Sequence, residues 1–362
     1  MDVHEKYMRM ALKLALKAKG KTSPNPMVGA LVVKGGRIIA QGFHEKAGLP
    51  HAEAVALDAA GAHARGATLY ITLEPCTHFG RTPPCVDRVI KSGVKEVVVG
   101  MIDPNPLNNG KGVRALQQHK IKVKVGVLED ELRKMNEVFI KYITKRLPFV
   151  TVKIAQSLDG KIATASGDSK WITSDASRAF AHRLRKDYDA IMVGVNTVLR
   201  DNPILDAWFS KKQPIKIVVD SQLSTPQNAN IFSKKRQVII ATLPISPGQE
   251  TENRSMLDGL ATFLEAKEKS GQVDLKDTLK KLAKLEIANV LVEGGGMLIG
   301  SLVDDGLVDK FMVFISPKII GGKDARTSVM GKGVARVEKA LRLKDVSVRR
   351  IADDFLIEGY VK

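Results

Sequence analysis

Four side chains near the start of the chain have the types and spacing of a metal site. His51 and Glu53 open an alanine-rich segment, HAEAVALDAAG, whose pattern predicts a helix. The only two cysteines of the chain, Cys76 and Cys85, follow in the loop LEPCTHFGRTPPC. One imidazole and two thiolates are good zinc ligands, and three protein ligands leave the fourth tetrahedral position to water. We therefore expect His51, Cys76 and Cys85 to bind a catalytic Zn²⁺.

The order of these residues, H-x-E before P-C and a second cysteine, is the signature of zinc-dependent deaminases. Zinc lowers the pKa of its bound water, and we expect Glu53 to move a proton from that water to a leaving amine. Pro83 and Pro84 predict a helix start beside Cys85, and a helix N-terminus favours a thiolate. A lone H-x-E is common at surface helix starts, and two cysteines alone are more often buried and inert than metal ligands. The prediction of a zinc site therefore rests on His51, Glu53, Cys76 and Cys85 together.

Composition and charge narrow the class of protein. Hydrophobic residues make up 44% of the 362 residues, which is enough for buried cores, and no apolar run approaches the length of a membrane span. Two cysteines and a charged N-terminal segment unlike a secretion signal predict a cytoplasmic protein. The net charge of +18 suits phosphorylated partners, but the basic residues are scattered and aromatics reach only 5%, so we expect no nucleic-acid partner.

Hydrophobic patterning predicts two α/β domains, residues 1–146 and 147–362, which divide near the Pro of KRLP. The first begins with a hairpin, MVGALVV-KGG-RIIAQGF, then alternates helices and strands, and ends in one long amphipathic helix over 129–146. The second contains the strand patterns FVTVKIA, DAIMVG, IKIVVD, QVIIAT, NVLVE and KFMVFIS, and closes with a hairpin. Both domains therefore belong to the α/β class.

The chain resembles the bifunctional deaminase/reductase family of riboflavin biosynthesis. The resemblance rests on NPMVG and on EPCTHFGRTPPC, which has eight residues between its cysteines where nucleic-acid and nucleoside deaminases have P-C-x-x-C. It implies a cytidine-deaminase-like three-layer α/β/α domain followed by a dihydrofolate-reductase-like α/β domain. It also implies deamination of 2,5-diamino-6-ribosylamino-4(3H)-pyrimidinone 5′-phosphate, then NADPH-dependent reduction of the ribosyl group, in a homo-oligomer without a membrane partner.

The resemblance also implies the substrate contacts of the deaminase half. Asn25 and His44 would hold the pyrimidine, while His78 and Arg81 would reach the substrate and its phosphate. Taken without the family, Asn25 is a turn residue between two prolines and His44 a polar residue at a strand end. Arg81 carries more information, because arginine suits bidentate phosphate recognition.

The second half has no G-x-G-x-x-G after a strand, so a Rossmann nucleotide site is not expected. The glycines of VEGGG favour either an anion at a helix N-terminus or a tight turn. The resemblance implies that the cofactor contacts are Ala155, Trp171, Thr197, Asp201, Ser221 and Gly295. It implies that the substrate contacts are Lys153, Ser169, Arg185, Leu205 and Glu293, with Lys153 also assisting reduction electrostatically.

One loop departs from the family pattern D-x-P-x-L-x-x-R, whose arginine contacts the substrate phosphate. This chain reads DNPILDAW, with Trp208 in place of the arginine and an acid at Asp206. Losing a charge-assisted phosphate contact costs about 2 kcal/mol of binding, unless Lys211 or Lys212 compensates. One alternative is therefore a deaminase with an impaired reductase half. The zinc site and the +18 charge also leave open a nucleic-acid-editing deaminase with a basic RNA-binding second domain. A polyanion-binding module with a structural zinc would need a fourth protein ligand.

Overall fold

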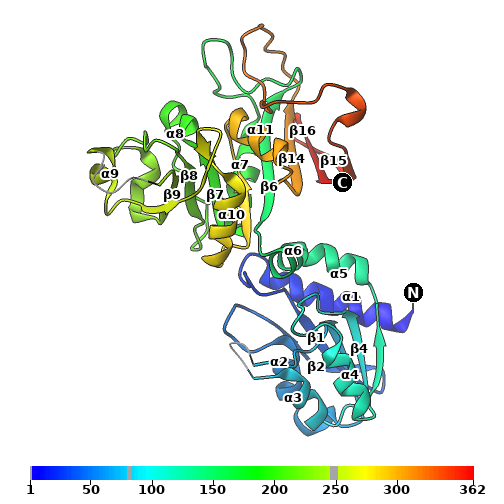
Figure 1. The fold of residues 1–362 in the computed structure, drawn as a ribbon. Coiled ribbons are helices and arrows are strands. Elements are labelled where there is room, and N and C mark those ends of the chain that lie inside the picture. Colours follow the sequence, from blue (N-terminus) through cyan, green and yellow to red (C-terminus); the bar gives the residue numbers. More distant parts are fainter. Residues whose placement is uncertain (1, 80–82, 245–251) are drawn as a thin grey trace. The chain divides into compact units, whose positions relative to one another are not determined.

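The computed structural model describes residues 2–79, 83–244 and 252–362 (Figure 1). The chain divides into two compact units, Met1–Leu147 and Pro148–Lys362. Within the described ranges, none of the helices combines the length and the apolar content needed to cross a lipid bilayer. Each unit is built on its own large sheet.

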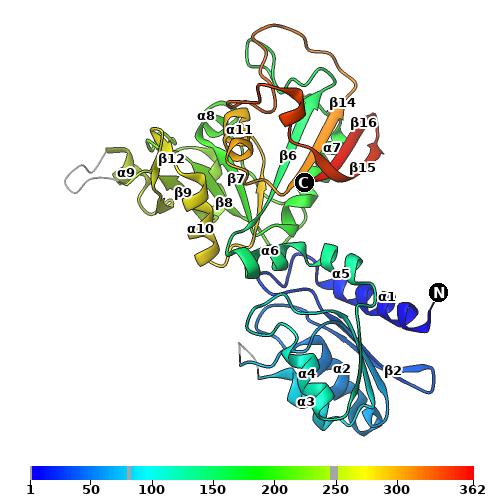
Figure 2. The same ribbon diagram turned by 45° about the vertical axis from the view of Figure 1, so that its right-hand side comes forward.

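The first unit has a five-stranded sheet in the order β2-β1-β3-β4-β5 (Figures 1 and 2). β1 pairs antiparallel with β2 and β3, whereas β3, β4 and β5 run parallel. The strands are β1 Gly29–Lys34, β2 Arg37–Phe43, β3 Thr68–Leu73, β4 Glu96–Met101 and β5 Lys122–Val125. The helices are α1 Val3–Ala15, α2 Ala52–Ala60, α3 Cys85–Lys91, α4 Lys111–Gln118, α5 Glu129–Met135 and α6 Glu137–Lys145.

Helices cover both faces of this sheet. Gly29 on β1 and Gly42 on β2 belong to successive cross-strand pairs, and successive pairs face opposite sides of a sheet. A Cβ on Gly29 would lie 2.1 Å from the carbonyl oxygen of Ala11 in α1, and a Cβ on Gly42 would lie 2.5 Å from that of Ala52 in α2. α1 and α2 therefore pack on opposite faces, and the predicted three-layer α/β/α arrangement is confirmed.

The single helix predicted over residues 129–146 is wrong, because the chain breaks it into α5 and α6 at Asn136. The buried Asn136 amide accepts from the main-chain N of Met27 at 2.8 Å and donates to the Met27 carbonyl at 3.0 Å. An asparagine side chain that bonds to distant main chain competes with helix continuation. Asn136 thereby ties the NPMVG segment to this helix pair.

The second unit has a nine-stranded sheet in its described part, in the order β10-β9-β8-β7-β13-β6-β14-β16-β15. The strands from β10 to β14 run parallel, and β16 and β15 continue the sheet antiparallel as the predicted closing hairpin. The strands are β6 Phe149–Ser157, β7 Ala190–Gly194, β8 Ile215–Val219, β9 Val238–Thr242, β10 Thr262–Glu265, β13 Asn289–Val292, β14 Lys310–Ser316, β15 Leu343–Ile351 and β16 Asp354–Val361.

Helices and a small ribbon complete the described part of this unit. The helices are α7 Asp175–Leu184, α8 Val195–Asp201, α9 Glu252–Leu257, α10 Leu275–Lys284 and α11 Gly296–Asp304, and the ribbon is β11 Glu268–Lys269 with β12 Gln272–Val273. α7 packs Phe180 against Phe314 of β14, with ring centroids 5.9 Å apart. In a mostly parallel sheet, ligands bind at the carboxyl ends of the strands. In this unit those ends precede Glu293, Thr197 and Ser221.

Replacing Gly42 by alanine puts a methyl group into the contact between β2 and α2, the helix that begins at the predicted zinc ligand His51. We expect the free energy of unfolding to fall by about 1–3 kcal/mol, because α2 must move away from the sheet. Thermal unfolding of the full chain, with zinc content measured on the same samples, checks this expectation. Gly194→Ala is the matched control, since a Cβ there meets its nearest atom, Leu298 Cβ, at 3.7 Å. Equal stability of the two variants would contradict the close packing.

Candidate active sites

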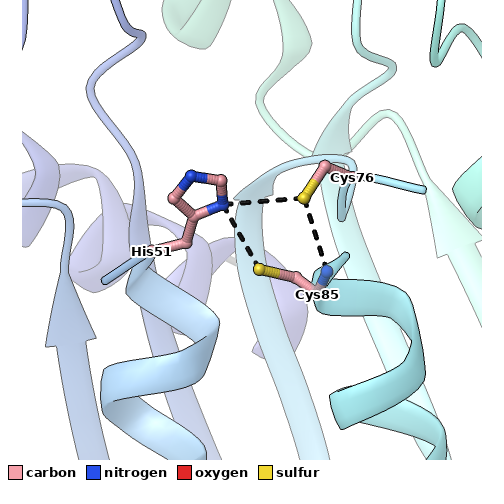
Figure 3. Close-up of side chains that lie close together, drawn as sticks. All are labelled: His51, Cys76 and Cys85. Carbon is pink, nitrogen blue, oxygen red and sulfur yellow. Dashed lines mark hydrogen bonds between the residues drawn. The ribbon is translucent and has the colours of Figure 1, made fainter. Parts of the chain in front are cut away.

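Three side chains of the first unit converge on one point (Figure 3). Nδ1 of His51 lies 3.6 Å from Sγ of Cys76 and 3.2 Å from Sγ of Cys85, and all three atoms lie within 4.8 Å of one another. A nitrogen and a sulfur that bind one tetrahedral zinc ion are about 3.6 Å apart, given the usual bond lengths. The spacing of these donors therefore fits a zinc ion.

Each donor comes from the end of a different element. His51 is the residue before α2, Cys76 follows β3, and Cys85 is the first residue of α3. The main-chain N of Cys85 donates to Sγ of Cys76 at 3.4 Å, and that of Val86 donates to the Cys76 carbonyl at 3.1 Å. The start of α3 thus directs two N–H groups to Cys76, one to its sulfur and one to its carbonyl oxygen.

The two thiols share one proton unequally. Hydrogen bonds from Cys85 and His51 lower the pKa of Cys76 to about 4. The hydrogen bond that Cys85 donates to Cys76, together with burial, raises the pKa of Cys85. A divalent cation replaces that shared proton and lets both sulfurs bind as thiolates. The chemistry of the donor set therefore agrees with its geometry.

A carboxyl and a second imidazole lie beside these donors. Glu53 is 3% exposed, and burial raises the pKa of its carboxyl. The His44 ring packs edge-on against His51, with centroids 5.3 Å apart, and burial lowers its pKa, which favours the neutral imidazole. His44 Nδ1 donates to the carbonyl of Pro50 at 3.1 Å, which leaves Nε2 to accept from the Asn25 amide at 3.1 Å. The fold thus brings Asn25, His44, Glu53 and the three donors into one site.

The other two predicted contacts of the deaminase half lie on the cysteine loop. Nδ1 of His78 is buried and has no hydrogen-bond partner in the described part of the chain. A buried polar atom of this kind needs a partner, and a bound substrate can supply one. Arg81 lies outside the described residues.

The second unit contains a buried ion cluster of Lys153, Arg185 and Glu293. Arg185 donates to both carboxylate oxygens of Glu293, at 2.7 and 3.0 Å, and Nζ of Lys153 lies 3.6 Å from the same carboxylate. Burial alone would raise the pKa of Glu293, but the charges of Arg185 and Lys153 lower it to about 2. These three predicted substrate contacts come from strand β6, from the turn after α7 and from the residue after β13.

His182, which the sequence analysis did not single out, joins this cluster. Its Nδ1 lies 2.9 Å from Nη1 of Arg185, and its ring stacks on Trp208 with centroids 3.8 Å apart and planes 7° apart. Burial and the charge of Arg185 lower its pKa to about 4, so it accepts the hydrogen bond as a neutral imidazole. The available signal was its place three residues before Arg185 on one helix face.

The acid at Asp206 also has a partner that sequence reasoning missed. Nζ of Lys216, a residue only 1% exposed in β8, lies 3.2 Å from Asp206, whose carbonyl accepts from Arg185 at 3.0 Å. The nearby Leu205 packs its buried side chain in the hydrophobic core with Val218 and others, which leaves its main chain to contact a ligand. Both unusual residues of this loop, Asp206 and Trp208, therefore have specific partners within the unit.

The predicted cofactor contacts lie near the carboxyl ends of the parallel strands. Gly294 and Gly295 have positive φ angles of 147° and 79°, and a Cβ on Gly294 would lie 3.3 Å from Oγ1 of Thr197. Ser221 accepts from the main-chain N of Val273 at 3.1 Å, and Ala155 lies within β6. Glycine at both positions keeps side chains out of the turn before α11, and a helix N-terminus favours a phosphate group, so these residues fit a phosphate-bearing cofactor such as NADPH.

The other predicted contacts lie on or beside the loop 158–174. Trp171 is exposed, and the Arg178 guanidinium lies 4.4 Å from its ring centroid. Burial raises the pKa of Asp201, while the charge of Lys170 acts against that rise. Ser169 is half-buried on the same loop, and none of its described contacts joins it to the Arg185 cluster. The exposed face of Trp171 is free to stack on an aromatic ring.

Known proteins resemble both units. The family model for the cytidine and deoxycytidylate deaminase zinc-binding region matches residues 1–101, and the model for the RibD C-terminal domain matches residues 148–357. Riboflavin biosynthesis protein RibD of Aquifex aeolicus is 46% identical to this chain, covering 98% of each, and that of Actinobacillus pleuropneumoniae is 43% identical, covering 98% of this chain and 94% of the relative.

A solved structure shows the same arrangement of elements. It is a diaminohydroxyphosphoribosylaminopyrimidine deaminase/5-amino-6-(5-phosphoribosylamino)uracil reductase from Thermotoga maritima, 39% identical, which matches with a TM-score of 0.87 over 99% of both chains. Fold, metal site and relatives together define a zinc-dependent deaminase joined to a reductase in one chain. The chain belongs to the RibD family, the bifunctional deaminase/reductases of riboflavin biosynthesis. The nucleic-acid-editing alternative is not favoured, because the second unit matches a reductase domain.

Glu293→Gln leaves the buried guanidinium of Arg185 without its counter-charge. We expect the free energy of unfolding to fall by about 3–5 kcal/mol, the usual cost of removing one partner of a buried pair. Denaturant unfolding of the full chain measures this loss. Glu338→Gln is the control, because its pair with Arg336 is exposed, and we expect little change there. Equal stability of the two variants would contradict the role of the cluster.

The same pair predicts a pH dependence. The pKa of Glu293 falls from 4.5 to about 2 in the folded chain, so its stabilisation is complete above pH 4.5 and is lost as the pH falls towards 2. The stability difference between the wild type and Glu293→Gln should therefore be constant near neutral pH and shrink through that acidic range. A difference that does not change with pH would contradict the ionised state of Glu293.

Proposed function

We propose that the deaminase half acts on 2,5-diamino-6-ribosylamino-4(3H)-pyrimidinone 5′-phosphate and that the reductase half converts the ribosyl group of the product to ribityl with NADPH. The family supports this substrate, and the name of the Thermotoga maritima structure describes the same two reactions. The observation that carries the proposal is the buried carboxyl of Glu53 beside the donors His51, Cys76 and Cys85.

In the deaminase half, bound zinc supplies a water molecule of lowered pKa. Glu53 would take up the two protons that this water loses, delivering one to the amine that leaves as ammonia and the other to the ring nitrogen beside the carbonyl that forms from the water oxygen. A buried carboxyl with a raised pKa suits both steps near neutral pH. The neutral His44 and the Asn25 amide hold the pyrimidine, and His78 with Arg81 hold the rest of the substrate and its phosphate.

In the reductase half, NADPH supplies the hydride that reaches C1′ of the sugar. The bond from C1′ to the ring oxygen breaks, negative charge develops on that oxygen, and it takes up a proton from solvent. Lys153 is the cation that would stabilise this charge, and the Glu293 carboxylate 3.6 Å away holds its ammonium group in place. Arg185 and Glu293, with Ser169 and Leu205, contact the substrate.

The cofactor lies along the carboxyl ends of the parallel strands in this proposal. Gly295 and Thr197 frame the N-terminus of α11 for a phosphate group, and Ala155, Trp171, Asp201 and Ser221 complete the contacts. Asp206 and Trp208 shape the neighbouring loop through Lys216 and His182, so the reductase half retains an ordered site without the arginine of the family pattern.

We also place the chain in the cytoplasm, because two of its three zinc ligands are free cysteines, which a reducing compartment maintains. The homo-oligomer that the family resemblance implies stays a prediction. Sedimentation of the purified protein measures it directly.

Glu53→Gln keeps the shape of the side chain but cannot carry the proton. We expect zinc to be retained and deamination to fall by about 10²–10⁴-fold, the range that general acid–base groups contribute. Zinc analysis and a deaminase assay without NADPH check both parts. Asp58→Asn on the same helix is the matched control, because Asp58 is exposed and pairs with Arg88. Unchanged turnover by Glu53→Gln would remove Glu53 from the proton transfer.

The complete function is tested by mass spectrometry of the diaminopyrimidinone ribosyl phosphate after incubation in ¹⁸O-labelled water. Without NADPH we expect an amine to be replaced by one labelled oxygen, since the new carbonyl oxygen comes from water. NADPH deuterated at the transferred position should then add one deuterium to the deaminated product.

The outcomes separate the two halves. Labelled deamination without reduction would contradict the reductase assignment and direct attention to Trp208, whose replacement by arginine would then be expected to restore reduction. No deamination by a zinc-loaded protein would contradict the substrate assignment itself.

A further inference from the structure

One asparagine outside the predicted site uses its whole side chain to bind the segment around Cys76. Asn108 is fully buried, and its Nδ2 donates to the carbonyl of Pro75 at 3.2 Å and to Asp103 at 3.1 Å. Its Oδ1 accepts from the main-chain N of Thr77 at 3.0 Å and from the Thr77 hydroxyl at 2.9 Å. A primary amide has two N–H donors and an oxygen with two lone pairs, so all its positions are filled.

The two main-chain partners of Asn108 are the residues directly before and after Cys76. A single amide therefore spans the residue that carries the sulfur and fixes the main chain on both sides of it. We infer that Asn108 is a positioning residue for zinc: it sets the place and direction of the Cys76 thiolate through Pro75 and Thr77. This inference rests on the proposed zinc-dependent deaminase.

The loop that carries Asn108 is itself anchored to the same strand end. Glu74, the residue before Pro75, accepts from the main-chain N of Asp103 at 3.1 Å and of Gly110 at 2.9 Å, and from that of Val113 at 3.0 Å. The segment from Asp103 to the first turn of α4 is thus bonded to Glu74 on one side and, through Asn108, to Thr77 on the other. Cys76 lies between these two anchors.

Packing gives this loop no room to move towards the cysteine segment. A Cβ on Gly112, in the first turn of α4, would lie 2.3 Å from the carbonyl oxygen of Pro75. Asp103 in turn accepts from the main-chain N of Asn105 at 2.9 Å, which holds its carboxylate towards Asn108. Asp103 therefore fixes the orientation of the Asn108 amide, as is usual for groups that hydrogen-bond beside metal ligands.

The chemistry of the site selects an amide at this position. Leucine has nearly the same shape, but it would leave the Pro75 carbonyl and the Thr77 N–H without partners in a buried place. Aspartate would keep an acceptor for Thr77, but it would turn a carboxylate oxygen towards the Pro75 carbonyl and towards Asp103. Only an amide donates on one side and accepts on the other.

Asn108→Leu in the full chain tests the inference. We expect zinc affinity, measured by competition with a chromogenic chelator, to fall by about 10–100-fold, the range found for partners of metal ligands. The Co²⁺-substituted protein should show a shifted or weakened thiolate-to-cobalt absorption band, because the angle of the Cys76 sulfur changes. Asn105→Leu is the matched control, since Asn105 lies in the same loop and its side-chain oxygen accepts from the main-chain N of Leu107.

A second variant keeps the test decisive if Asn108→Leu does not fold. Asn108→Asp retains the acceptor for Thr77 and loses both donated hydrogen bonds, so we expect a loss of zinc affinity in the same direction. Wild-type zinc affinity and cobalt spectrum in a folded Asn108 variant would overturn the inference, as would equal losses in Asn105→Leu. Failure of the wild type to bind one zinc ion per chain would instead overturn the proposed function.

Discussion

Two sulfur atoms, an imidazole and a buried carboxyl occupy one small volume of the first unit, and the surrounding structure depends on this electrostatic constraint. Without a cation, the hydrogen bond between the two sulfurs lowers the pKa of Cys76 and raises that of Cys85. A bound cation allows both side chains to be thiolates. Each donor lies at the end of an element, so the elements must meet closely. The close contact of Gly42 with α2 and the hydrogen bonds of the Asn108 amide both hold these element ends together.

The second unit also buries charged side chains, and here lysine and arginine side chains compensate the buried carboxylates. Glu293 is buried, and Arg185 and Lys153 hold it ionised, while Asp206 pairs with the buried Lys216. Buried ion pairs of this kind add little net stability, but removing one partner is costly. Their effect here is to fix the direction of several buried charged groups, among them Glu293 directly after β13.

In the loop that departs from the family pattern, the two unusual residues, Asp206 and Trp208, have partners within the same unit. Trp208 replaces a cation, yet its ring stacks on His182, and His182 accepts from Arg185. Trp208 therefore makes an aromatic contact with a residue that bonds to the ion cluster, where the family resemblance implies a phosphate contact. The side chain of Asp206, the second unusual residue, pairs with Lys216. Its main-chain carbonyl accepts a hydrogen bond from Arg185.

The sequence by itself determined the two α/β domains, the zinc chemistry and the family, because these depend on residue types at short spacings and on local periodicity. It also predicted one continuous helix where Asn136 divides two, since the competing bonds to Met27 come from 109 residues away. Only the tertiary structure decided that His182, Lys216 and Asn108 belong to the sites. The partners of Lys216 and Asn108, and the Trp208 ring on which His182 stacks, lie on other segments, and no local pattern records a contact that exists only when distant segments pack together.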